Sequence, residues 1–360
     1  MVQKVKRVHL ALFFKDFAVW LHSSCVGLNV AAYSTAKVLR ENGIDATAFP
    51  VRHNVDVVNA IDQYNETHRE RLTHVVISAP WLSERDIKAL LCGFPEIQFV
   101  VLSHSNVGFL QADPDGVYLL RRYLELSKAF TNLRVGGNSE RFVAWFQMAY
   151  DDRIVLLPNL YSLAGYRPSK VWVGSWPLRI GSFGAIRPLK NFMTSAGAAL
   201  LIGKYHRVPV EFHMSCGGES SGNGIVLAIE EMLARTGVKL IKHEWELWDK
   251  FVQVVANMDL LIQPSYTESF NMITADGIRA GVASVVSPAI YWAPKEWQVD
   301  PDDAASVALV GRQLLAKPAA NDGRKALANH NTFGLRCWGE FLYGKVEEVA
   351  WYRKILRKVW

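Results

Sequence analysis

The chain has 360 residues, half of them hydrophobic and 21% charged, and its formal net charge is +6. This length exceeds one ordinary hydrophobic core and indicates two domains of a folded globular protein. No run of eighteen apolar residues is present and the N-terminus lacks a signal-peptide pattern, so we expect no transmembrane segment. The four scattered cysteines include no CxxC pair, which excludes a disulfide framework and makes the cytoplasm the expected compartment.

The first half of the sequence alternates short apolar runs with helical or loop segments. A helix is predicted from Leu28 to Asn42, ended by Gly43. Predicted buried strands are Val8 to Phe14, Ile44 to Val51, His74 to Ser78 and Gln98 to Leu102, followed by Arg134 to Glu140 and Ile154 to Pro158. Such alternation predicts a parallel sheet with helices on both faces.

The loop after the first predicted strand, His22 to Gly27, contains a single glycine and is therefore not the GxGxxG dinucleotide fingerprint. Gly27 has no side chain, so the backbone there could approach a ligand closely. A plain tight turn explains the same glycine equally well.

His104 follows the predicted strand Gln98 to Leu102 directly, within the polar run Ser103 to Asn106. Ligands of open α/β sheets collect at the carboxyl ends of strands, so this histidine is well placed to contact one. An ordinary hydrogen-bonded loop histidine is the alternative interpretation.

The second half opens after an aperiodic segment, Tyr166 to Pro177, which we interpret as the linker between domains. A strand is predicted from Leu178 to Ser182, and a helix from Asn191 to Ile202 is expected to end at Gly203. Arg187 and Lys190 lie between them, where a guanidinium and an ammonium can both face a diphosphate. Taken alone, a basic pair at a helix start more often faces solvent.

Further alternation follows, with strands predicted at Val208 to Ser215 and Val238 to Ile241. The segment His243 to Asn257 is predicted to be a helix carrying Trp245 and Trp248, for which packing is favoured over stacking on a nucleotide base. The aromatic tail after Asn331 is predicted to be an amphipathic helix.

Two His and Cys pairs have a spacing that metal ligands can use, His213 with Cys216 and His22 with Cys25. A structural zinc normally needs four ligands, and neither pair has a second pair nearby. No metal site is therefore predicted.

The stretch Met258 to Pro288 predicts a strand, a polar loop, a helix and a second strand. The strands are Met258 to Ile262 and Val282 to Val286. The helix is expected to begin near Asn271, capped by Ser269 or Asn271 itself, and to stop at Gly281.

Two carboxylates belong to this stretch. Glu268 stands just ahead of the predicted helix, and Asp276 lies on it, four residues after Met272 and on the same face. The N–H groups of a helix start can hold a phosphate while carboxylates accept hydrogen bonds from hydroxyls. Alternatively, Glu268 caps the helix and Asp276 is solvated.

Glu268 and Asp276, in the order strand, loop, helix, resemble the donor-sugar motif of the retaining glycosyltransferases of family 4. In that family a Glu is followed by Gly-Phe-Gly, and a second Glu comes eight residues after the first. Here Ser269 and Asn271 replace the glycines and Asp276 replaces the second Glu. Asparagine tolerates left-handed backbone, so the loop can keep its course. Arg187 with Lys190 is similar to the family's cations that neutralise the leaving diphosphate.

The resemblance implies an α/β protein of GT-B fold, two Rossmann-like domains with parallel sheets facing across a cleft. It implies a retaining, metal-independent transfer of a hexosyl or pentosyl group from a nucleotide-diphosphate sugar, which is a donor substrate, so no cofactor is expected. Glu268 and His104 are the implied catalytic residues, Glu268 orienting the sugar hydroxyls and His104 contacting the sugar. The implied donor-binding residues are Gly27, Arg187, Lys190, Ser269, Phe270, Asn271, Met272 and Asp276, the last holding the ribose.

By the same resemblance, residues 1–168 form an acceptor domain, 169–335 a donor domain, and 336–360 a helical segment that crosses back. The expected acceptor is a glycan or a lipid-linked sugar, with a hydroxylated DNA base second. A sugar-nucleotide epimerase of the same fold and a non-catalytic sugar-nucleotide-binding protein are the alternatives. Basic clusters at Lys4 to Arg7 and Arg353 to Lys358 allow peripheral contact with an anionic surface, although a solvated face explains them more simply.

Overall fold

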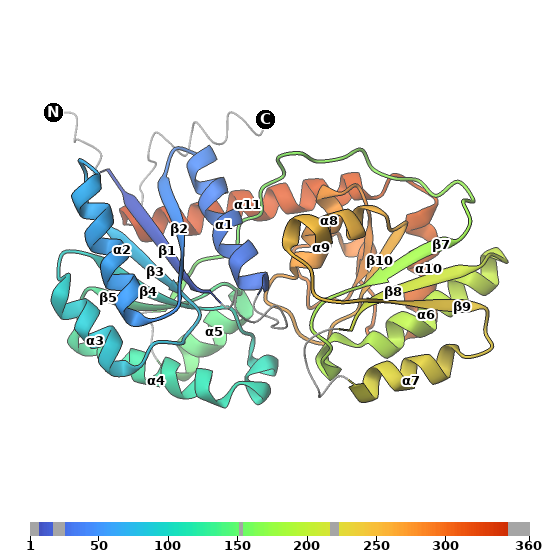
Figure 1. Ribbon diagram of the computed structural model, residues 1–360, viewed down its shortest axis with the longest axis horizontal. Helices are drawn as coiled ribbons and strands as arrows, with labels where there is room; N and C mark the ends of the chain where they lie inside the picture. The colour runs from blue at the N-terminus through green and yellow to red at the C-terminus, as the bar shows by residue number, and fades with distance from the viewer. Residues whose placement is uncertain (1–6, 17–25, 151–153, 217–222, 345–360) are drawn as a thin grey trace. The chain divides into compact units, whose positions relative to one another are not determined.

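The computed structural model describes residues 7–16, 26–150, 154–216 and 223–344, and the chain divides into two compact units (Figure 1). Unit 1 comprises Met1–Asp16, Leu28–Ser162 and His330–Trp360, and unit 2 comprises Phe17–Gly27 and Leu163–Asn329. After Leu28 the chain therefore passes from one unit to the other at 162/163 and at 329/330, whereas the predicted boundaries are 168/169 and 335/336.

Unit 1 contains a six-stranded sheet whose strand pairs are all parallel. In sheet order the strands are β2 (Asp45–Val51), β1 (His9–Lys15), β3 (His74–Ser78), β4 (Gln98–Ser103), β5 (Leu133–Gly137) and β6 (Val155–Leu156). The helices that alternate with them are α1 (Val26–Glu41), α2 (Asn54–Thr67), α3 (Glu84–Gly93), α4 (Pro114–Ala129) and α5 (Glu140–Ala149).

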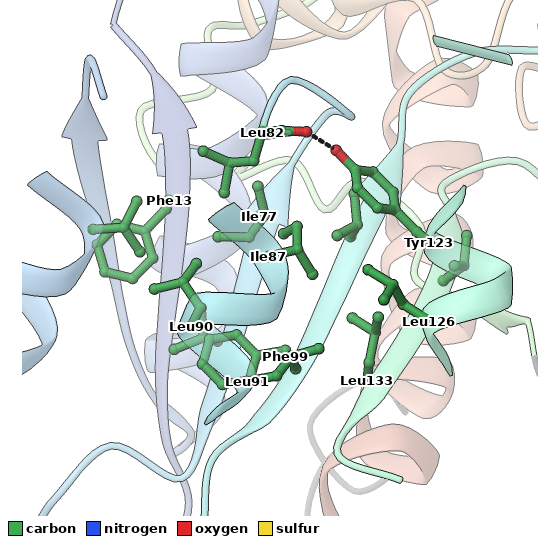
Figure 2. Close-up of a cluster of buried hydrophobic side chains, with 14 of the residues drawn as sticks. Phe13, Ile77, Leu82, Ile87, Leu90, Leu91, Phe99, Tyr123, Leu126 and Leu133 are labelled. Carbon is green, nitrogen blue, oxygen red and sulfur yellow. Dashed lines mark hydrogen bonds between the residues drawn. The ribbon is translucent and has the colours of Figure 1, made fainter. Parts of the chain in front are cut away.

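Hydrophobic side chains cover both faces of this sheet because successive residues of a strand point to opposite sides. In β1, Ala11 and Phe13 belong to a core that includes residues of α2, α3, α4 and α5. Figure 2 shows this core, in which the buried hydroxyl of Tyr123 donates to the carbonyl of Leu82. Leu10 and Leu12 belong to the opposite core, which α1 and the last helix cover.

That last helix is α11 (Ala320–Tyr343), and its residues from His330 onward pack within unit 1. Trp338 Nε1 donates to the carbonyl of Pro158 at 2.9 Å, and Asn331 exchanges two hydrogen bonds with the backbone of Tyr161 at 2.8 and 3.0 Å. The helix begins at Ala320, earlier than the start predicted after Asn331.

Unit 2 contains a five-stranded sheet whose strand pairs are also parallel. In sheet order the strands are β11 (Ser284–Val286), β10 (Leu260–Gln263), β7 (Leu178–Ser182), β8 (Val210–Ser215) and β9 (Val238–His243). Its helices are α6 (Phe192–His206), α7 (Asn223–Leu233), α8 (Trp248–Ala256), α9 (Met272–Arg279) and α10 (Ala304–Leu315). The predicted α/β class with two parallel sheets is confirmed.

Two predicted helix boundaries in unit 2 are wrong. Helix α6 continues through Gly203 to His206 and ends at Arg207, which adopts left-handed backbone (φ 55°). Strand β9 extends to His243 and α8 begins only at Trp248, so Trp245 lies in an irregular segment and not on a helix. None of the helices formed by described residues combines the length and the apolar character that crossing a bilayer requires.

Candidate active site

Two loops of unit 2 meet at the carboxyl end of its sheet. One follows β7 and carries Lys190, and the other follows β10 and carries Glu268. Since β7 and β10 are neighbours in the sheet, residues 78 positions apart in the chain come together there: Lys190 Nζ lies 2.5 Å from Glu268 Oε1. A hydrogen bond of 2.9 Å from the N–H of Tyr266 to the carbonyl of Leu189 joins the two loops and fixes this register.

The carboxylate of Glu268 is held by several donors. Besides Lys190, the hydroxyl of Ser265 and the amide nitrogen of Asn271 each donate to Oε1 at 2.8 Å. The side chain of Glu268 is 9% exposed and that of Lys190 24% exposed. Charge-assisted hydrogen bonds in such a sheltered place are stronger than on open surface, so they orient the carboxylate firmly.

Asn271 has left-handed backbone (φ 69°, ψ 89°) at the start of α9. Its Oδ1 accepts from the N–H of Thr274 at 2.8 Å, which caps the helix, while its Nδ2 donates to Glu268. Asparagine is one of the few residues that tolerates this conformation, which explains how it can stand where a glycine is otherwise expected. The cap predicted at Ser269 or Asn271 is Asn271.

Buried contacts support the loop that follows β10. Phe270 is 2% exposed, its ring stacks on Trp292 with 5.1 Å between centroids, and its carbonyl accepts from Trp292 Nε1 at 2.6 Å. The hydroxyl of Ser287 donates to the carbonyl of Ser265 at 2.5 Å. Phe270 therefore packs beneath the loop, while Ser269 just before it and Met272 two residues after it are partly buried.

Asp276 lies one turn further along α9 and is 2% exposed. Its Oδ1 accepts from Trp248 Nε1 at 3.1 Å, and the Trp248 ring lies 5.1 Å from the guanidinium carbon of Arg279. The first residue of α8 thus holds a carboxylate of α9. Asp276 is not solvated, which rules out that alternative.

Arg187 belongs to the same loop as Lys190, and its carbonyl accepts from the Lys190 N–H at 2.9 Å. Arg187 precedes a short turn, Pro188–Lys190, and Lys190 is its last residue. The turn is followed by Asn191, a second asparagine with left-handed backbone (φ 58°). Asn191 Nδ2 donates to the carbonyl of Pro301 at 2.5 Å and so anchors the end of this loop.

His104 follows β4 in unit 1, among neutral polar partners. Its Nε2 lies 2.8 Å from the hydroxyl of Ser78, and its Nδ1 lies 3.2 Å from the amide nitrogen of Asn138. Burial lowers the pKa of His104 from its ordinary 6.5 to about 4. Because the amide nitrogen can only donate, Nδ1 is the acceptor and the ring proton is on Nε2.

Gly27 is the second residue of helix α1, and a Cβ built there would meet no atom within 4 Å. The prediction that Gly27 belongs to the loop before the helix is therefore wrong, because the helix begins at Val26 and not at Leu28. The loop residues His22 and Cys25, and with them one of the two candidate metal pairs, lie outside the described residues, as do Lys4, Lys6 and the cluster Arg353 to Lys358.

Cys216, of the other candidate pair, donates its thiol to the carbonyl of His243 at 3.5 Å, while His213 Nδ1 lies 2.9 Å from His243 Nε2. Burial and the neighbouring imidazole lower the pKa of His213 to about 4. Among the described residues, no group of three or more His, Cys, Asp or Glu side chains could hold a metal ion.

The sequence did not single out Ser265, Asn191 or Trp292 as parts of the site. Ser265 and Asn191 are small polar residues at the ends of loops, and nothing in their local pattern marks which group they bind. Trp292 contacts Phe270 from 22 positions away in the chain. Contacts between loops that follow different strands bring these residues together.

No known protein family matches the chain in a scan of family profiles, and no curated protein matches it in sequence. Its fold matches many solved structures. Sucrose-phosphate synthase from Thermosynechococcus elongatus superposes with a TM-score of 0.61 at 14% identity, over 97% of this chain and 100% of that one. Anabaena HepE in complex with UDP-glucose gives 0.54 at 12% identity, over 98% and 99%.

A variant of S. aureus TarM in complex with fondaparinux, α-GlcNAc-glycerol and UDP gives a TM-score of 0.54 at 14% identity, over 75% of this chain. The present chain spans 55% of the length of that protein. These structures are GT-B glycosyltransferases, and at such low identity the likeness establishes the fold. The chain has the GT-B fold, as predicted.

Proposed function

We propose that this protein is a retaining glycosyltransferase, of the family 4 type, that moves a sugar from a nucleotide-diphosphate sugar to a hydroxyl acceptor without a metal ion. The observation that carries the proposal is the 2.5 Å contact between Lys190 and Glu268 at the carboxyl ends of β7 and β10. The similar structures that contain UDP or UDP-glucose support a nucleotide-sugar donor.

The positive groups in these loops can bind the diphosphate of a nucleotide-sugar donor, which leaves when the sugar is transferred. A lysine ammonium has three N–H donors, and one of those on Lys190 faces Glu268, so two can reach phosphate oxygens. Since the Glu268 charge offsets that of Lys190, Arg187 in the same loop supplies the additional positive charge that a diphosphate requires. The N-terminus of α9 adds the partial positive charge of its backbone N–H groups.

Glu268 is the residue proposed to orient the sugar. Its carboxylate, positioned by Ser265, Asn271 and Lys190, accepts hydrogen bonds from sugar hydroxyls. The bond between the anomeric carbon and the phosphate oxygen breaks as the acceptor oxygen attacks from the same face, and the acceptor proton passes to the departing phosphate. Fixed positive groups beside the diphosphate stabilise the charge that develops there.

Two further roles belong to the proposal. Asp276 accepts hydrogen bonds from the ribose with the carboxylate that Trp248 holds in place, and His104 offers the sugar a neutral imidazole. A glycan or lipid-linked sugar is the proposed acceptor, with a hydroxylated DNA base second. The expected cytoplasmic location stays a prediction.

The test incubates the purified protein with a panel of nucleotide-diphosphate sugars, beginning with UDP-glucose, with and without acceptor oligosaccharides. Release of the nucleoside diphosphate, with the anomeric configuration of the product read by NMR, supports the proposal when the configuration is retained. An isomerised sugar nucleotide would indicate an epimerase instead. Donor binding by calorimetry with no turnover for any acceptor would indicate a binding protein.

A further inference from the structure

A different surface of unit 2 lies at the opposite edge of its sheet from Lys190 and Glu268. It consists of residues 170–177, 201–208 and 309–318, and we call it the amino-edge surface. The first segment leads into the amino end of β7 and the second into the amino end of β8 (Figure 1). The third, the end of α10, joins the first through a 3.0 Å hydrogen bond from the N–H of Trp172 to the carbonyl of Leu315.

Ring contacts make the three segments one continuous surface. Trp172 meets His206 edge-on at 4.8 Å between centroids, and His206 meets Tyr205 at 5.0 Å. The guanidinium carbon of Arg312 on α10 lies 2.9 Å from the centre of the Tyr205 ring on α6. Helices α6 and α10 also pack against each other along their length, since a Cβ on Gly311 would meet Ile202.

Large apolar side chains are exposed across this surface. Val173 is 88% exposed, Trp176 69% and Tyr205 58%. Three more exposed apolar residues belong to the same segments: Val171, Leu201 and Leu309. Single exposed apolar residues are normal on a protein surface, but six of them on three adjoining segments indicate a place where something else binds.

The charge of the same surface has one sign. Its three segments contain no Asp or Glu. Lys204, Arg207, Arg312 and Lys317 all belong to it, and none of the four forms an ion pair with a residue that the structure describes. The amino group of Lys170, by contrast, is engaged by the carbonyls of Ala256 and Met258. The exposed apolar residues thus share their segments with four cations that form no ion pair among the described residues, and one of these cations, Arg312, stacks on the Tyr205 ring.

We propose that the amino-edge surface docks on a membrane that contains anionic phospholipids. Val173 and Trp176 would enter the boundary between headgroups and acyl chains, where tryptophan and tyrosine are favoured, and the four cations would meet the lipid phosphates. A second copy of the chain fits this surface poorly, because a symmetric contact would bring the cations of both copies together. A neutral glycan would leave the four positive charges without partners.

The experiment measures co-sedimentation of the full chain with vesicles of phosphatidylcholine alone and with vesicles containing about one third phosphatidylglycerol. Binding to the second vesicles and not to the first is expected. The double variant V173S/W176S should bind about tenfold more weakly, because it removes the inserted apolar area. The variant K204E/K317E should bind at least about 25-fold more weakly, since each cation near an anionic surface contributes about fivefold in affinity.

Matched controls come from unit 1. Met148 is 84% exposed, so M148S removes a comparably exposed apolar side chain, and R85E/K88E changes the net charge by the same amount as K204E/K317E. Both controls should bind vesicles like the unaltered protein. The proposal is overturned if the protein does not bind anionic vesicles, if the controls lose binding equally, or if the patch variants instead abolish a dimer seen by light scattering.

Discussion

The polar groups after β4 in unit 1 and those after β7 and β10 in unit 2 stand at the same kind of place, the carboxyl end of a parallel sheet, yet they differ in charge. His104 is surrounded by a hydroxyl and an amide, and its pKa of about 4 keeps it neutral near pH 7. Lys190 and Glu268 are a charged pair. The difference indicates two tasks: the loops after β7 and β10 can balance a phosphate, whereas the neutral groups around His104 offer hydrogen bonds.

The largest effect on turnover is expected from Glu268→Ala, which removes the charged acceptor at the centre of the unit 2 site. The loss of a charged hydrogen bond in a sheltered site costs about 2–4 kcal/mol, so kcat/KM should fall roughly 30-fold to 1000-fold. Glu268→Gln keeps the shape of the side chain without its charge, so its kcat/KM should lie between those of the unaltered protein and Glu268→Ala. Steady-state kinetics on donor and acceptor measures both variants.

The control for this prediction is Glu246→Ala, which removes an exposed carboxylate of unit 2 whose partner is Lys250 at 3.8 Å. It should leave turnover unchanged, because an exposed ion pair contributes little. A Glu268→Ala protein that is folded by circular dichroism and fully active would remove Glu268 from the site.

The next effect concerns the cations of the same loops. Arg187→Ala and Lys190→Ala should each weaken binding of a nucleoside diphosphate about 10-fold to 100-fold while changing nucleoside binding little, because each removes a phosphate partner and nothing that meets the base. Calorimetry with UDP and uridine separates the two. Equal losses for both ligands would show that these residues act through the loop structure, and Lys250→Ala provides the control for a lysine elsewhere in unit 2.

The prediction at Asn271 concerns stability instead of ligand binding, because this residue caps α9 with left-handed backbone. Asn271→Ala loses the cap on Thr274 and places an alanine at φ 69°, so the free energy of unfolding should fall by about 2–3 kcal/mol. Asn271→Gly accepts the left-handed backbone and should lose less. Chemical unfolding of the two variants ranks them. If the alanine variant is as stable as the glycine variant, the left-handed backbone is not what selects asparagine here.

The sequence predicted strands more reliably than helix ends, and the glycines show why. Gly43 and Gly281 follow predicted helices and have positive φ, 82° and 80°, as a helix-ending glycine does. Gly203 looks the same in sequence but lies inside α6, where a Cβ would come 2.6 Å from Val210 Cγ2. Because Gly203 has no side chain, α6 can pack closely against Val210 of β8, and no local sequence pattern predicts this contact.

The site was predictable where motif and topology agreed. Glu268 and Lys190 could be expected to approach each other because both follow strands of one parallel sheet. The bond from Trp248 to Asp276 could not, because it depends on how α8 packs beside α9. The predicted helix start at His243 also puts Trp248 in the interior of the helix, whereas Trp248 is the first residue of α8. Hydrophobic periodicity predicts single helices and strands, but it does not predict the contacts that depend on how these elements pack against one another.

The smallest effect on turnover is expected from the pH dependence of His104. Because folding lowers its pKa from 6.5 to about 4, the unfolded chain takes up this proton first as the pH falls. The free energy of unfolding therefore receives no penalty from His104 above pH 6.5 and decreases progressively between 6.5 and about 4. His330 and His213 have pKa values lowered to about 4 as well, so the contribution of His104 is the difference between the unaltered protein and His104→Gln. That difference should be flat above pH 6.5 and grow below it.

The turnover of the unaltered protein should not titrate near pH 6.5, because His104 stays neutral there. The variant His104→Gln should therefore show the same pH profile as the unaltered protein. Its kcat should fall by less than about tenfold, since a neutral amide can still donate to a sugar oxygen. If kcat instead changes with pH near 6.5, and this change is absent in His104→Gln, the histidine is a proton donor. The contrast between the charged pair of unit 2 and the neutral histidine of unit 1 would then no longer hold.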